Sequence, residues 1–240
     1  VGTTSYISGN LGKLAKVMGV PVVTLVVHGS YLANPFWDEE HTRIVPMEAR
    51  MECVYTKEEL QNASGEQIQK RLYQALQYDE YAWQKARGIK ITKPGRAEGL
   101  HKALYKCRCC MDEESMATYK DMLICKKCGT SWKMTEYGEL QGKRAVLRIS
   151  DWYEWQRREA VCEWREIKKP LCFSVRVEAL PNAKGFVPLG EGRLTLDEDA
   201  FTLKIKEKRV VFLHHVRESV QTEYDYRKRG ECIVLSTTDC

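Results

Sequence analysis

The first quarter of the chain changes from a helical to an extended pattern of apolar positions. Residues 10–19 repeat apolar side chains at helical spacing and end in Gly19, so they predict a short amphipathic helix. Pro21–Val27 is a nearly continuous apolar run, which predicts a strand buried on both faces in a helix-flanked sheet. His28 follows at the strand end, where it either lines a ligand pocket or, as we favour, forms a local hydrogen bond.

A second strand and more helices follow. Apolar and polar residues alternate over 43–54, which predicts a strand with one buried face near a sheet edge. Thr56 and Ser64 each begin a capping-box pattern. The second pattern opens a long helix that is predicted to run to about Arg87.

The last third of the chain has the period of two that is typical of strands. Asp151 caps a helix whose Trp152 and Trp155 are expected to face the core. A small antiparallel β domain follows, in which His214 and His215 share a strand and point to opposite faces. Its strands are expected around 173–177, 193–196, 201–206, 209–216, 220–226 and 231–236.

The overall composition describes a globular protein. The 240 residues are 43% hydrophobic and 30% charged, enough for one large domain or two to three small ones, and the net charge of +5 is too mild to identify a partner. The longest largely apolar run, Val20–Val27, is too short to cross a bilayer, and there is no signal-peptide pattern. Ten cysteines, four of them at a spacing typical of metal binding, favour a reducing, cytoplasmic location.

The cysteine spacing is the strongest chemical signal. Cys107-x2-Cys110 is followed after fourteen residues by Cys125-x2-Cys128, a spacing that supplies four thiolates to one tetrahedral zinc ion. Cys109 is expected to point away from the metal. A site closed by four thiolates has no position for water, so we predict a structural rather than a catalytic Zn²⁺.

Basic residues dominate the segment that leads into these cysteines. Against Glu98 alone, residues 85–108 carry Lys85, Arg87, Lys90, Lys93, Arg96, Lys102, Lys106 and Arg108. Such a run is either a solvated face or a surface for an anionic partner, which is a lipid headgroup or a nucleic acid. The acidic residues of 111–124 are poorly suited to phosphates, so nucleic acid is the less favoured partner.

Several motifs resemble one enzyme family. Gly2-Thr3-Thr4-Ser5, the helix Leu11–Met18 and Gly19-Val20-Pro21-Val22-Val23 resemble the second half of the PlsC-like lysophospholipid (1-acylglycerol-3-phosphate) acyltransferases. The later order of cysteine ribbon, Asp151-Trp152-Tyr153-Glu154-Trp155 and β domain resembles a bacterial branch of that family.

The resemblance implies acyl transfer from a thioester, either acyl-CoA or acyl carrier protein, to the hydroxyl of a lysophospholipid at the inner face of the cytoplasmic membrane. The family uses a histidine followed five residues later by an aspartate as its general base. None of the five histidines has this aspartate, because the corresponding residues are Ala33, Pro46, Lys106, Ser219 and Val220. We therefore expect the chain to be a fragment whose catalytic motif lies upstream of Val1.

The same comparison leaves the substrate-binding residues unknown. Val1 and Thr4 stand where the family has the glutamate and arginine of its phosphate-binding motif. The charged contacts to the acceptor phosphate are therefore missing, and the chain as given is expected to be inactive.

The sequence thus predicts a partial α/β acyltransferase core with a zinc ribbon and a small antiparallel β domain. The expected boundaries are 1–102 for the core, 103–140 for the ribbon, 141–170 for a Trp-rich helical linker and 171–240 for the β domain. The alternative function is a zinc-ribbon module that binds nucleic acid or another protein.

Overall fold

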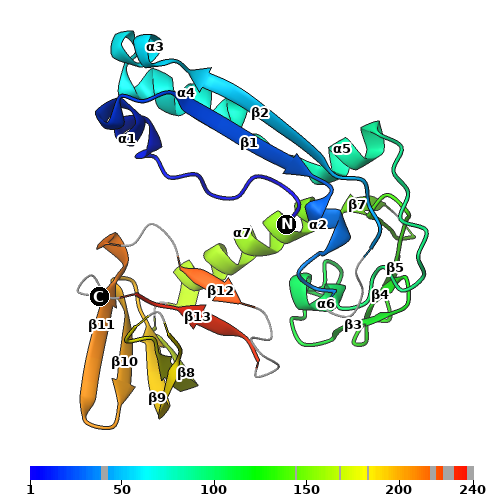
Figure 1. Cartoon of the computed structure of the whole chain (residues 1–240). Helices are drawn as coiled ribbons and strands as arrows, with labels where there is room; N and C mark the ends of the chain where they lie inside the picture. The colour runs from blue at the N-terminus through cyan, green and yellow to red at the C-terminus, as the bar shows by residue number, and fades with distance from the viewer. Residues whose placement is uncertain are drawn as a thin grey trace. The chain divides into compact units, whose positions relative to one another are not determined.

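The chain forms helices and small antiparallel sheets (Figure 1). The structure is a computed structural model, and it describes every residue except 39–42, 144, 168, 183, 217–219, 224–229 and 237–240. The chain divides into two compact units, Val1–Ala160 and Val161–Cys240. A combination of helices and antiparallel sheets was expected from the sequence, and the structure shows both.

The first unit begins with an antiparallel strand pair and several short helices. β1 and β2 pair from Val22↔Tyr55 to His28↔Glu48. Both predicted capping boxes form, at Thr56 and Ser64. The elements are α1 (Leu11–Met18), β1 (Val22–His28), α2 (Ser30–Ala33), β2 (Glu48–Tyr55), α3 (Lys57–Asn62), α4 (Gly65–Ala75) and α5 (Glu80–Ala86).

β1 is not buried on both faces, so that prediction is wrong. Thr24 and Val26 are buried, whereas Val23, Leu25 and Val27 are exposed. The reason is that β1 has a single neighbour, β2, in the described part of the chain, and no described element covers the second face. The apolar run therefore forms a strand with one buried face and one exposed face.

The helix predicted from Ser64 to Arg87 is also interrupted. α4 ends at Ala75 and α5 begins at Glu80. Asp79 caps α5 by accepting a hydrogen bond from Ala82 N (2.9 Å), and Tyr78 N donates to Thr4 Oγ1 (2.6 Å). A contact across more than 70 residues thus breaks a helix that the local pattern favours.

α1 packs closely on α4 because Gly12 lies at their contact. A Cβ added at Gly12 would lie 2.3 Å from Gly65 O, so only glycine permits this approach. Gln69 fixes the same contact, since its Oε1 accepts a hydrogen bond from Gly12 N at 2.7 Å. Ile68 and Leu72 of α4 are buried in the small core behind it.

The cysteine-rich part is a five-stranded antiparallel meander in consecutive order. Its core is continuous with that of the preceding helices and with the first half of α7. Trp152 of α7 is fully buried, donates from Nε1 to Lys106 O (3.0 Å) and meets the Trp132 ring edge-on at 4.8 Å. The elements are α6 (Leu100–Ala103), β3 (Met116–Tyr119), β4 (Met122–Cys125), β5 (Ser131–Met134), β6 (Glu139–Gln141), β7 (Val146–Arg148) and α7 (Ile149–Ile167).

Arg96 joins the meander to the segment before it. Its guanidinium is buried, donates to Met134 O (3.0 Å) and Lys93 O (3.2 Å), and pairs with Asp121 (3.0 Å). Its own carbonyl oxygen accepts a hydrogen bond from Arg43 at 2.9 Å. One basic residue of the 85–108 segment is therefore an internal support and not part of a basic surface.

The second unit confirms the predicted antiparallel β domain. One sheet has the order β11-β10-β9-β8, and β12 pairs with β13. His214 and His215 do not share a strand, because β11 ends before them and His214–Val216 form a 3₁₀ turn that is held by His214 N donating to Asp199 O (2.8 Å). The predicted residues 224–226 lie outside the described residues. The strands are β8 (Leu171–Ala179), β9 (Val187–Leu196), β10 (Ala200–Ile205), β11 (Lys208–Leu213), β12 (Gln221–Glu223) and β13 (Cys232–Val234).

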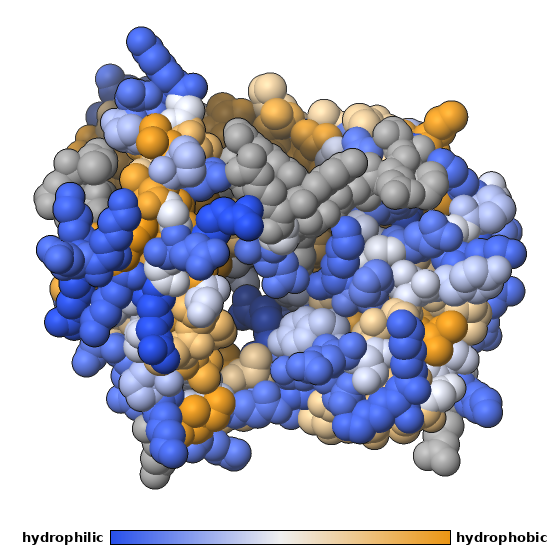
Figure 2. Space-filling model, turned by 90° about the horizontal axis from the view of Figure 1, so that it is seen from below, coloured by the Kyte–Doolittle hydropathy of each residue, from blue (hydrophilic) through white to orange (hydrophobic). Residues whose placement is uncertain are grey.

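The surface carries apolar as well as polar side chains. Figure 2 shows hydrophobic residues, in orange, among the hydrophilic ones on the face it displays. Within the described residues, no helix combines the length and apolar character that crossing a bilayer requires.

Replacing Arg96 with methionine tests the support that it gives to the meander. The change keeps much of the side-chain volume but removes the guanidinium that pairs with Asp121 Oδ2 and donates to two carbonyl oxygens. We expect a loss of about 2–4 kcal/mol in the free energy of unfolding, measured by urea denaturation. The control is Arg50→Ala, which removes an exposed pair with Glu52 at 3.8 Å and should change stability by no more than about 0.5 kcal/mol. Equal losses in both variants would contradict the assignment.

Candidate metal centre

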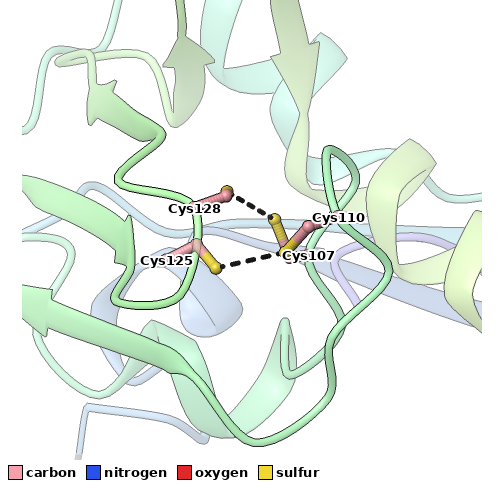
Figure 3. A group of neighbouring side chains, drawn as sticks. All are labelled: Cys107, Cys110, Cys125 and Cys128. Atoms are coloured by element: carbon pink, nitrogen blue, oxygen red, sulfur yellow. Dashed lines mark hydrogen bonds between the residues drawn. The ribbon is translucent and has the colours of Figure 1, made fainter.

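Four cysteines from two loops converge on one point (Figure 3). Cys107 and Cys110 lie in the loop after α6, and Cys125 and Cys128 lie at the end of β4 and in the turn that follows it. Their sulfur atoms are all within 4.8 Å of one another. Two of the sulfur–sulfur separations are 3.8 Å, for Cys107–Cys128, and 3.6 Å, for Cys110–Cys125. The sequence spacing predicted this set of residues.

Backbone hydrogen bonds shape both loops. Met111 N donates to Cys107 O (3.0 Å), and Gly129 N donates to Cys125 O (2.9 Å), so each cysteine pair sits in one tight turn. Gly129 has φ +70°, a left-handed conformation that glycine adopts without steric cost. Lys126 N also donates to Ser115 O (2.8 Å), which keeps the second turn beside the first loop. The sulfur atoms are therefore oriented by the backbone itself.

The sulfur atoms differ in their surroundings. Cys107 is buried, and desolvation raises the pKa of its thiol to about 12. Cys128 is exposed, its Sγ lies 3.3 Å from Thr130 Oγ1, and hydrogen bonding by Thr130 lowers the pKa of its thiol to about 6. A bound cation favours the thiolate form of both residues. Its effect has to be larger at Cys107, because the pKa of that thiol is raised.

Two lysines next to the cysteines in sequence form ion pairs. Lys127 lies 2.6 Å from Asp112, which raises the pKa of the lysine and lowers that of the aspartate to about 2. Lys106 is 1% exposed and pairs with Glu113 at 3.1 Å. Four thiolates around a divalent ion carry a net charge of −2, and the charge of Lys127 interacts with Cys110 and Cys125 as well as with Asp112. Cys109, the fifth cysteine of the segment, is exposed and lies outside the cluster, as expected.

A second polar cluster lies at the end of β1. His28 Nδ1 lies 3.1 Å from Glu80 Oε2, as expected for a hydrogen-bonded histidine, and its ring stacks between those of Tyr78 and Trp83. Glu80 is fully buried and also accepts a hydrogen bond from Gly29 N at 2.6 Å. Sequence reasoning missed Glu80, because it is 52 residues from His28 and its only local signal is its place after the helix cap.

Most basic side chains of residues 85–108 already have acidic partners. The pairs are Lys85–Glu139 (2.9 Å), Arg87–Glu48 (2.6 Å), Lys90–Glu136 (3.4 Å), Arg96–Asp121 (3.0 Å) and Lys106–Glu113 (3.1 Å). Arg108 lies over the Trp155 ring, 4.9 Å from its centroid. The charge run in the sequence is thus largely balanced in the fold.

Comparison with known proteins gives no match: no protein-family model, no curated protein and no solved structure matches the chain. What the chain does is therefore inferred from its own residues.

Replacing Thr130 with valine tests the hydrogen bond to Cys128. The change keeps the side-chain shape but removes the hydroxyl group that favours the thiolate. We expect the affinity for Zn²⁺ to fall by about ten-fold or more, measured by competition with a chromophoric chelator. Thr222→Val in β12, an exposed position outside the sulfur cluster, is the matched control and should leave the affinity unchanged. Equal affinities in the two variants would show that the hydroxyl does not act on the centre.

Proposed function

We propose that the chain is the zinc-containing C-terminal portion of a PlsC-like lysophospholipid acyltransferase. The observation that carries the metal part is the convergence of Cys107, Cys110, Cys125 and Cys128. The sequence resemblance of residues 2–23 and of the order that follows them supports the acyltransferase part.

The donor set fits zinc. Zn–S bonds of about 2.3 Å in a tetrahedron give sulfur–sulfur distances of about 3.8 Å. The separations of 3.8 Å for Cys107–Cys128 and 3.6 Å for Cys110–Cys125 agree with this value. Four thiolates in a tetrahedral arrangement select Zn²⁺ or iron among biological metals, and a four-sulfur zinc site is typical of ribbons.

The zinc is structural in this proposal. Four protein ligands leave no position for water or substrate, so the ion supplies folding energy and no reaction step. The chain's own residues orient the sulfurs through the backbone bonds to Cys107 and Cys125, and Lys127 offsets part of the negative charge.

The acyltransferase part needs a general base from elsewhere. Its reaction requires a histidine that removes the proton of the acceptor hydroxyl while the acyl thioester is attacked. No histidine of the chain is followed five residues later by aspartate. His28 and Glu80 form a different pair, with 19% of the His28 side chain exposed and its ring held between two aromatic rings. We assign this pair to fixing the end of β1.

The alternative, a nucleic-acid-binding ribbon, is disfavoured by the charges. Affinity for nucleic acid depends on cations that neutralise phosphates. Lys85, Arg87 and Lys90 each lie within 3.4 Å of a carboxylate oxygen, so their attraction to an anion is reduced. The same pairing limits the attraction of this segment to anionic lipid, and a role in vesicle binding stays a prediction.

Cysteine replacements test the metal assignment. Cys110→Ser and Cys128→Ser should each abolish stoichiometric zinc, measured by elemental analysis of the purified chain, because serine is a poor zinc ligand. Amide exchange across Met116–Met134 should accelerate in both variants. Cys109→Ser is the control and should retain one zinc per chain. Full zinc content in the Cys110 and Cys128 variants would refute the four-thiolate site.

Enzyme assays test the acyltransferase part. The chain alone should release no coenzyme A from acyl-CoA in the presence of lysophosphatidate, because it lacks the general base. A longer product of the same gene that includes a His-x4-Asp segment should release coenzyme A, and changing that histidine to alanine should abolish the release. Failure of the longer product, together with oligonucleotide binding that falls steeply with salt, would favour the alternative.

A further inference from the structure

The four converging cysteines differ in how easily solvent reaches them. Cys107 and Cys125 are buried, Cys110 is half-buried and Cys128 is exposed. Figure 3 marks two contacts that cross from one cysteine loop to the other, Cys107–Cys128 at 3.8 Å and Cys110–Cys125 at 3.6 Å. Each contact therefore joins a buried cysteine to one that solvent reaches more readily.

This arrangement meets the requirements of disulfide formation in two steps. An oxidant first has to reach one thiolate, and a second thiolate has to react with the product before it is oxidised further. Cys128 is accessible to the oxidant, and the sulfur of Cys107 lies 3.8 Å from its own. Because a disulfide bond is about 2.0 Å long, the sulfur atoms of either pair have to approach by less than about 2 Å more.

The positions in sequence favour bonds between the loops over bonds within a loop. Cys107 and Cys128 are 21 residues apart, and Cys110 and Cys125 are 15 apart, whereas two residues separate the cysteines of each loop. A disulfide that closes a longer loop restricts the unfolded chain more, so it stabilises the fold more. Bonds between the loops also join the same two segments that a bound ion joins.

We propose that the four cysteines form a reversible oxidation switch. A peroxide converts the metal-binding thiolates into the disulfides Cys107–Cys128 and Cys110–Cys125, and the ion is released. The inference rests on the metal part of the proposed function and is independent of the acyltransferase part. Cys107 and Cys125 belong to the core that also contains Leu100 and Trp152, so the oxidation changes the packing of α6 and α7.

The oxidation is balanced by hydrogen peroxide as the electron acceptor. The thiolate of Cys128 attacks one oxygen, the O–O bond breaks, and a sulfenic acid and one hydroxide form. The thiolate of Cys107 then attacks the sulfenic sulfur, which forms the S–S bond and expels a second hydroxide. The two sulfurs together lose two electrons, and the peroxide gains them. Cys110 and Cys125 react in the same way with a second peroxide, after which no thiolate remains to bind the ion.

Disulfide mapping tests the pairing, because trypsin separates the four cysteines. Cleavage after lysine and arginine places them in the peptides 107–108, 109–120, 121–126 and 128–133. The zinc-loaded chain is treated with hydrogen peroxide, its remaining thiols are blocked with N-ethylmaleimide, and the unreduced digest is analysed by mass spectrometry. We expect links between 107–108 and 128–133 and between 109–120 and 121–126. A link between 107–108 and 109–120, or sulfonic acids in place of disulfides, would overturn the proposal.

Zinc release and its reversal are measured on the same samples with a chromophoric chelator. Peroxide should release the bound zinc, while the untreated chain should retain it. Dithiothreitol and added Zn²⁺ should then restore the original zinc content, because thiols reduce the disulfides. Zinc that stays bound after peroxide treatment, with all four cysteines still blocked as free thiols, would contradict the switch.

Two cysteine variants serve as controls. Cys109 is exposed and shares its tryptic peptide with Cys110, so Cys109→Ser shows which of the two forms the bond. This variant should release zinc and form both links as the unchanged chain does. Loss of the link between 109–120 and 121–126 would assign the bond to Cys109 and overturn the proposal. Cys162→Ser, at an exposed position of α7 outside the sulfur cluster, should change neither measurement.

The outcomes distinguish this inference from the proposed function. A purified chain that binds no zinc before any oxidation would overturn the proposed metal site and this inference with it. A chain that binds one zinc ion but forms no disulfide between the loops would overturn the switch and leave the structural zinc site standing.

Discussion

The convergence of four sulfur atoms is the constraint on which the first unit depends. The meander strands are only three or four residues long, too short to be stable by themselves. Two of the sulfurs, those of Cys107 and Cys125, belong to the same core as Leu100 and Trp152. The candidate metal centre is therefore part of a shared core, and a bound ion would affect the packing of α6 and α7 as well as the two cysteine loops.

What could be predicted from the sequence was local. The cysteine spacing, the two capping boxes and the period of two after Leu171 each act within a few residues, and the structure shows the elements they predict. The errors came from contacts between distant residues. The free face of β1 and the interruption before Asp79 depend on which segments meet, and periodicity along the chain does not show this. The hydrogen bond of His28 was expected, but its partner Glu80 could not be identified for the same reason.

The charges illustrate the same limit. The run of lysines and arginines in the sequence suggests a basic surface. In the fold, carboxylates 25 and 54 residues away pair with two of these residues, in Arg96–Asp121 and Lys85–Glu139. The fold converts a candidate binding surface into internal and surface ion pairs. The paired residues of this segment therefore hold parts of the fold together.

The break between α4 and α5 has a consequence for conformational change. The hydrophobic pattern of residues 64–87 still favours a single helix, and the hydrogen bonds of Thr4 with Tyr78 together with the Asp79 cap oppose it. Gly2 O also accepts a hydrogen bond from Glu80 N at 2.8 Å, so the first residues of the chain hold this junction in place. Because flanking helices already exist, joining them needs no new nucleation. Loss of these hydrogen bonds would therefore allow one longer helix, and it would move the Glu80 carboxylate away from His28.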